Sequence, residues 1–140
     1  RSPVRSTASG SPETTWTGTE LFDIIPPLSM DLTTREDGRV TILTASGNLV
    51  IGAPESLFKK TVTRLIEEER VFLLVDLKGV NFLDSSGLGA LVRAMTLSQK
   101  EGGQTKLVYA GPQIRKLLEM TKLDSVFETY DDMERAVASF

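Results

Sequence analysis

Residues 71–77 constrain the fold more than any other stretch, because they read Val-Phe-Leu-Leu-Val-Asp-Leu with no alternation of apolar and polar side chains. Such a nearly continuous apolar strand is typical of a parallel sheet that is covered on both faces. A helical pattern follows, in which Leu88, Leu91, Val92 and Met95 recur at i, i+3, i+4 and i+7. The stretch therefore predicts a central strand that leads into a helix.

Along the rest of the chain, segments with the apolar pattern of a strand likewise alternate with segments that have the apolar spacing of a helix. Two early strand patterns flank Asp37-Gly38, a hairpin signal, which predicts that these two strands pair antiparallel. We expect a turn at 35–38 and a loop at 47–53. We expect strands at 30–34, 39–46, 71–77, 105–110 and 126–129, and helices at 54–69, 86–100, 112–121 and 131–140. This order predicts an α/β fold: a mostly parallel sheet of about four to five strands with one antiparallel edge strand, about four helices and right-handed crossovers.

The first part of the chain differs in composition from the rest. Residues 1–27 begin with a segment rich in Ser, Thr, Pro and Gly, which predicts a flexible or partly docked N-terminal tail, and residues 28–140 are expected to form the domain. Residues 21–25, Leu-Phe-Asp-Ile-Ile, form an apolar cluster in this tail, which Trp16 could join. The cluster either docks on the domain or on a neighbouring copy, or is a chance feature of a disordered arm.

Composition argues against several classes of function. The net charge of −3 gives no reason to expect nucleic acid or an anionic membrane as a partner. The chain has no cysteine and no histidine, which removes disulfides, thiolate metal sites, the commonest zinc ligand and the commonest general base. No apolar run approaches the ~20 residues of a membrane helix, and the N-terminus lacks an apolar signal core. We therefore expect a cytoplasmic protein without metal or cofactor.

Residues 84–89, Asp-Ser-Ser-Gly-Leu-Gly, lie where the central strand is expected to give way to the helix. A helix N-terminus offers free backbone N–H groups and the positive end of the helix dipole, so a phosphoryl group on one of the serines would meet an anion site. Gly87 and Gly89 together cost the helix about 2 kcal/mol relative to alanine. They indicate either tight packing beneath a Ser or Asp N-cap, or close approach by a partner.

Enzymatic chemistry fits the chain poorly. It lacks the Gly-x-x-x-x-Gly-Lys-Ser/Thr pattern of a P-loop, and residues 87–92 begin like a dinucleotide fingerprint but lack its third glycine. Ser85 or Ser86 as a nucleophile would need a base other than histidine. Asp76 and Asp84 could form a metal pair, although Asp76 fits the end of a strand better. We therefore expect a protein that is not an enzyme.

The motif at 84–89, together with Gly102-Gly103 and the stretches 106–109 and 122–127, resembles the STAS domains of bacterial anti-sigma factor antagonists. The resemblance covers roughly residues 28–140 and implies the STAS fold. It implies a protein that binds an anti-sigma factor when unphosphorylated and so releases a sigma factor. That partner would also be a serine kinase, which uses ATP to phosphorylate Ser85, and a serine phosphatase would reset the switch.

The resemblance also implies which residues meet the partner. They are Asp84, Ser85, Ser86, Gly87, Leu88, Gly89 and Asn48. Asn48 lies in the segment 47–50, where many members of the family carry Gly-x-x-Asp with an acid that assists partner binding or phosphorylation; here Val50 stands in place of that acid. We expect a monomer or weak homodimer. Two alternatives stay open: a constitutive scaffold subunit of a larger signalling assembly, and a STAS module that binds a ligand.

Overall fold

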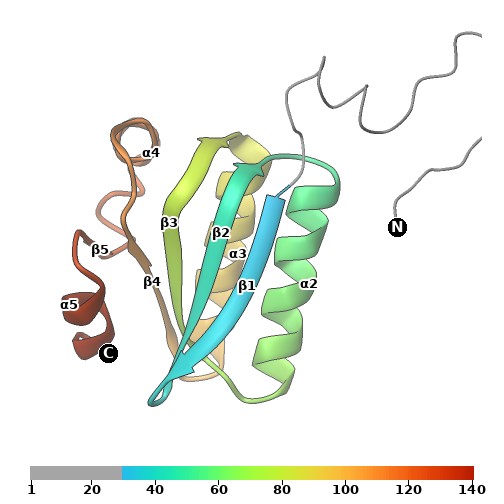
Figure 1. Ribbon diagram of the computed structural model, residues 1–140, viewed down its shortest axis with the longest axis vertical. Coiled ribbons are helices and arrows are strands. Elements are labelled where there is room, and N and C mark those ends of the chain that lie inside the picture. Colours follow the sequence, from blue (N-terminus) through green and yellow to red (C-terminus); the bar gives the residue numbers. More distant parts are fainter. Residues whose placement is uncertain (1–29) are drawn as a thin grey trace, which may run out of the picture.

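Residues 30–140 are described by the computed structural model, in which five strands form one mixed sheet (Figure 1). In chain order the elements are β1 (Met30–Asp37), β2 (Val40–Leu49), α2 (Ala53–Glu67), β3 (Phe72–Leu83), α3 (Ser85–Lys100), β4 (Gln104–Val108), α4 (Pro112–Met120), β5 (Thr129–Tyr130) and α5 (Met133–Ala138). The strands lie in the order β1-β2-β3-β4-β5; β1 is antiparallel to β2, and all other neighbours are parallel. This arrangement confirms the predicted α/β class with one antiparallel edge strand.

Two strands extend further than predicted towards the carboxyl edge of the sheet. β2 continues to Leu49, so the loop predicted at 47–53 begins too early. β3 runs to Leu83 instead of ending at residue 77, because its ladder with β2 continues as far as the pair of these two leucines. The unbroken apolar pattern ends near residue 77 because β4 stops opposite Asp76, and several side chains in the rest of β3 are exposed.

Other predicted boundaries are also wrong. β1 extends to Asp37, through residues predicted as a turn at 35–38, because an exposed edge strand tolerates polar side chains. β5 is two residues long and begins where the strand predicted at 126–129 was expected to end. α5 is shorter than the predicted 131–140. α2 ends before Glu69, which has a φ of 65°, a left-handed conformation that does not continue a right-handed helix.

Apolar layers cover both faces of the sheet. On one face α2, α3 and α4 pack over the larger core, and on the other α5 packs over a smaller one. β4 contributes side chains to both layers, because successive side chains of a strand point to opposite faces of the sheet. Leu107 lies in the larger core with Phe58 and Leu91, whereas its neighbour Val108 packs with Ala136 of α5. The double cover is what the unbroken apolar run of β3 predicted.

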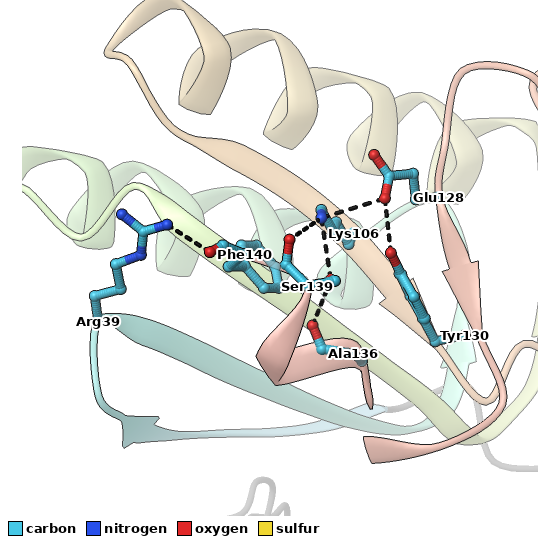
Figure 2. A network of polar contacts seen from close by, with 7 residues as sticks. All are labelled: Arg39, Lys106, Glu128, Tyr130, Ala136, Ser139 and Phe140. Carbon is cyan, nitrogen blue, oxygen red and sulfur yellow. Dashed lines mark hydrogen bonds and ion pairs between the residues drawn. The ribbon is translucent and has the colours of Figure 1, made fainter. Parts of the chain in front are cut away.

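A buried lysine fastens α5 to the sheet (Figure 2). Lys106 of β4 is 4% exposed, and its ammonium donates to the carbonyl oxygen (2.8 Å) and the hydroxyl (3.0 Å) of Ser139 and forms an ion pair with Glu128 (3.2 Å). These contacts match the three N–H donors of the ammonium. The same ammonium lies 4.8 Å from the ring centroid of Phe140, whose carbonyl accepts a hydrogen bond from Arg39 in the β1–β2 turn.

The predictions for the first part of the chain lie outside the described residues. These are the flexible or docked tail over 1–27, the apolar cluster at 21–25 and the contribution of Trp16. Within residues 30–140, no helix combines the length and the apolar character that crossing a bilayer requires.

Candidate functional site

Asp84 joins two segments that meet at the carboxyl edge of the parallel strands. It is the N-cap of α3, where its Oδ1 accepts a hydrogen bond from the backbone N–H of Gly87 at 2.8 Å. Its Oδ2 accepts a second one from the N–H of Ile51, in the loop between β2 and α2, at 3.0 Å. One carboxylate thus caps the helix and holds the neighbouring loop against it.

The surroundings of Asp84 favour its ionised form. Burial raises the pKa of the carboxyl, but hydrogen bonds from the backbone N–H groups of Ile51, Gly87 and Ser86 outweigh it, so the pKa lies below its ordinary value. The positive end of the α3 dipole acts in the same direction. The site therefore holds a fixed negative charge next to the two serines.

The two serines of the motif differ in accessibility. Ser85 is the first residue of α3 and is exposed, whereas Ser86 is half-buried. The Ser85 side chain stands at the N-terminus of a 16-residue helix, where the helix dipole favours an anion. A molecule that approaches this edge can reach Ser85 more easily than Ser86.

The two glycines of the first helical turns have different surroundings. A Cβ on Gly87 would lie 2.1 Å from the carbonyl oxygen of Leu49, so only glycine lets α3 pack this closely on the end of β2. A Cβ on Gly89 would meet nothing within 4 Å, and Gly89 is exposed. Close packing therefore explains Gly87, while no contact within residues 30–140 requires Gly89.

The predicted partner-binding residues divide between surface and core. Gly87 and Leu88 are buried, with Leu88 only 7% exposed. Those that reach the surface are Asp84, Ser85, Ser86, Gly89 and Asn48, of which Ser85 and Gly89 are exposed and the others are half-buried. Any direct contact with a partner therefore falls mainly on the exposed pair and its half-buried neighbours.

The segment 47–50 lies beside this helix start. Asn48 is opposite Phe82 in the β2–β3 ladder, near the end of β3. The N–H of Asp84 donates to the carbonyl of Leu49 at 3.4 Å, which draws the end of β2 against the start of α3. Val50, which replaces the family's acid, is half-buried at the same place and brings no charge to it.

Sequence reasoning missed an apolar surface along this edge. Ile51 is 69% exposed, Phe82 56% and Met120 70%. Phe82 and Met120 line a groove of about 310 Å³ between the end of β3 and α4. The available signal was the long spacing between the apolar run at 71–77 and the motif at 84–89, which leaves room for a strand that continues beyond its neighbour.

The structure separates the two acids that were considered as a metal pair. Asp76 and Asp84 are joined by the extended second half of β3, which spans about 26 Å at ~3.3 Å per residue. The Oδ1 of Asp76 instead accepts a hydrogen bond from the backbone N–H of Lys78 at 3.0 Å. Within the described part of the chain, no group of three or more acidic, His or Cys side chains could hold a metal ion.

Comparison with known sequences gives a family for this chain. Residues 31–136 match the family model of the STAS domain. Over 65 residues the chain is 31% identical to the anti-sigma F factor antagonist of Paenibacillus polymyxa, an alignment that covers 46% of this chain and 56% of that protein. The chain thus spans little more than half the length of that relative.

Comparison with solved structures gives the same fold. An anti-sigma factor antagonist from Mycobacterium paratuberculosis superposes with a TM-score of 0.71 and 25% identity, over 79% of this chain and 93% of that one. The Bacillus cell fate determinant SpoIIAA in its phosphorylated form superposes with a TM-score of 0.65 and 18% identity, over 78% of this chain and 98% of that one. With most of its residues matched by the family model, the chain belongs to the STAS domain family.

Proposed function

We propose that this domain is an anti-sigma factor antagonist that binds, through its α3 edge, an anti-sigma factor that is also a serine kinase. The α3 edge is defined here as residues 84–89 with Asn48 and Ile51. In the unphosphorylated state this edge occupies the kinase and thereby releases a sigma factor. The proposal is carried by the exposure of Ser85 at the first position of α3, beside a cap that is already satisfied by Asp84. The STAS family and the names of the similar proteins support the class of partner.

Phosphorylation of Ser85 switches this binding off. The kinase transfers the γ-phosphoryl group of ATP to the Ser85 Oγ: the new O–P bond forms as the bond to ADP breaks, and the hydroxyl proton passes to a base of the kinase. The phosphate adds about −1.5 to −2 charges near pH 7. A serine phosphatase removes it by hydrolysis and restores binding.

The fold accommodates this charge, whereas the contact with the partner does not. The phosphate stays in water at the exposed Ser85, next to the positive end of α3. Asp84 is held in place by the N–H groups of Ile51 and Gly87, so its negative charge remains beside the phosphate. The partner then faces about −2.5 to −3 charges on this edge. SpoIIAA, which shares the fold, has been solved in a phosphorylated form, and this supports a switch that leaves the sheet intact.

Two features of the α3 edge suit close contact with a protein. The open space over Gly89 lets the partner's backbone approach α3 directly. Ile51 offers an exposed apolar side chain at the end of the loop that Asp84 holds. In this role the chain supplies a binding surface and a substrate hydroxyl in the cytoplasm, and the catalytic groups belong to the kinase.

A kinase assay tests the site. The full chain is incubated with ATP and its cognate anti-sigma serine kinase, and phosphate is located by tandem mass spectrometry. We expect a single phosphate on Ser85, none on the Ser85→Ala variant, and a phosphate still located on Ser85 in the matched variant Ser86→Ala. Phosphate found on Ser86 alone would overturn the site assignment.

A constitutive scaffold is the second candidate, and Val50 is the residue that favours it, because it replaces an acid that assists phosphorylation in many members of the family. Size-exclusion chromatography with light scattering separates the two roles. A monomer or weak homodimer supports the switch, and a large homo-assembly supports a scaffold subunit.

A further inference from the structure

An apolar groove adjoins the α3 edge and has no part in the proposed function. The β3–β4 ladder stops at Asp76, whereas β3 continues to Leu83, and α4 packs near this upper part of β3 (Figure 1). The groove of about 310 Å³ lies between them. Phe82 and Met120 line it with more than half of each side chain in solvent, at 56% and 70%. Neighbouring exposed apolar side chains of this kind are characteristic of binding surfaces.

α4 turns one face towards the groove. Gln113, Lys116, Leu117 and Met120 follow the spacing i, i+3, i+4 and i+7, and all four line it. Leu117 is half-buried and Lys116 is exposed. Lys116 is the one charged residue among those that line the groove. The groove therefore suits an apolar segment that also carries an acid.

The register of the sheet brings the start of β1 to the same edge. Met30 is paired with Gly47, and Gly47 is paired in turn with Val80, two residues before Phe82. Neighbouring strands are ~4.8 Å apart, so Met30 starts about 10 Å from Val80, three residues before the end of β3. Met30 therefore lies at the edge of the sheet at which β3 ends.

The sequence before Met30 contains a segment with the required chemistry. Residues 21–25, Leu-Phe-Asp-Ile-Ile, place four large apolar side chains around one acid, Asp23. Asp23 lies seven positions before Met30, a reach of up to about 23 Å. Pro26 and Pro27 favour an extended backbone in this connection. The segment can therefore span the ends of β2 and β3 and reach α4.

We propose that residues 21–25 bind in the groove between β3 and α4 of their own chain, with apolar side chains on Phe82 and Met120 and with Asp23 facing Lys116.

A paramagnetic label tests this contact in the full chain. The chain has no cysteine, so a nitroxide on the variant Thr19→Cys is attached at one site. The chain has four methionines, and their methyl signals can be followed by NMR. We expect strong broadening of the Met120 methyl signal and a sharp signal from Met133, which begins α5 and packs on the opposite face of the sheet. Adding Phe22→Asp and Ile24→Asp to the labelled chain should restore the Met120 signal.

A charge reversal and a mixing experiment complete the test. Lys116→Glu should reduce the broadening of Met120, whereas the matched control Lys60→Glu, an exposed lysine on α2, should leave it unchanged. Absence of Met120 broadening overturns the proposal. Broadening that appears only when labelled chains are mixed with isotope-labelled, nitroxide-free chains also overturns it, because the occupant is then a second copy. No kinase is present, so the result is independent of the proposed function.

Discussion

Substituting alanine at Gly87 and at Gly89 should change stability in opposite directions. The two glycines lie in the same region of α3 and gain similarly from alanine's higher helix propensity, about 1 kcal/mol at most. At Gly87 the new Cβ would lie 2.1 Å from the carbonyl oxygen of Leu49, a backbone atom that cannot move aside alone. Overpacking of this kind costs about 1–3 kcal/mol or more. We expect Gly87→Ala to lose about 2 kcal/mol net and Gly89→Ala to gain up to about 1 kcal/mol.

Urea unfolding followed by circular dichroism measures both changes. With a slope of about 1–3 kcal/mol per molar urea, a difference of about 3 kcal/mol between the variants moves their midpoints at least about 1 M apart. A Gly87→Ala protein as stable as the wild type would refute the packing argument. If Gly89→Ala lost stability instead, the space over Gly89 would not be open, and the case for partner approach at this position would fail with it.

Three further predictions concern the cap, the buried lysine and the switch. Asp84→Ala should cost about 1–2 kcal/mol near neutral pH, because it removes the cap and the bond to Ile51. The pKa of Asp84 is lower in the folded than in the unfolded protein, so the stability that its ionised carboxylate contributes is present above the unfolded pKa and is lost as the pH falls through the folded pKa. The urea midpoints of the variant and the wild type should therefore converge in strong acid. A difference between the midpoints that stays constant with pH would contradict this. Lys106→Met should lower the free energy of unfolding by about 1–3 kcal/mol, because it keeps the packing but leaves Ser139 without its hydrogen-bond donor. Amide hydrogen exchange should become faster in α5 and not in α2. Ser85→Asp should weaken binding to the anti-sigma kinase about tenfold or more in calorimetry while Ser85→Ala retains it, and equal affinities would argue against a charge-based switch.

Local patterns in the sequence were enough for the type and order of the elements. The apolar run at 71–77 predicted a buried strand, and the helical spacing from Leu88 onwards predicted the helix that follows it. Element ends were predicted less well, because they depend on the neighbouring strand. The extension of β3 to Leu83 is fixed by its ladder with β2, and no pattern inside the segment itself indicates how long that ladder is.

The roles of the site residues could not be predicted from the sequence, because they depend on contacts between segments that are distant in the chain. Gly87 and Gly89 are the same residue type two positions apart, and only the carbonyl of Leu49 distinguishes them. Asp84 was predicted as a cap candidate, but its second bond reaches Ile51 in a loop far away in the sequence. Lys106 was placed on a strand by its apolar neighbours, while its burial depends on Ser139 and the chain that follows α5.

The attachment of Phe140 determines how the molecule is best tethered in a binding measurement. The Phe140 ring meets the ring of Phe72, the first residue of β3, edge-on at 6.4 Å, and β3 then runs for 12 residues, about 40 Å, before α3 begins. A dye, resin or sensor chip joined beyond Phe140 therefore sits at the end of the molecule remote from Ser85. Met30, where β1 begins, lies towards the Ser85 end instead. Immobilisation through the C-terminal side leaves the surface of interest facing the solution.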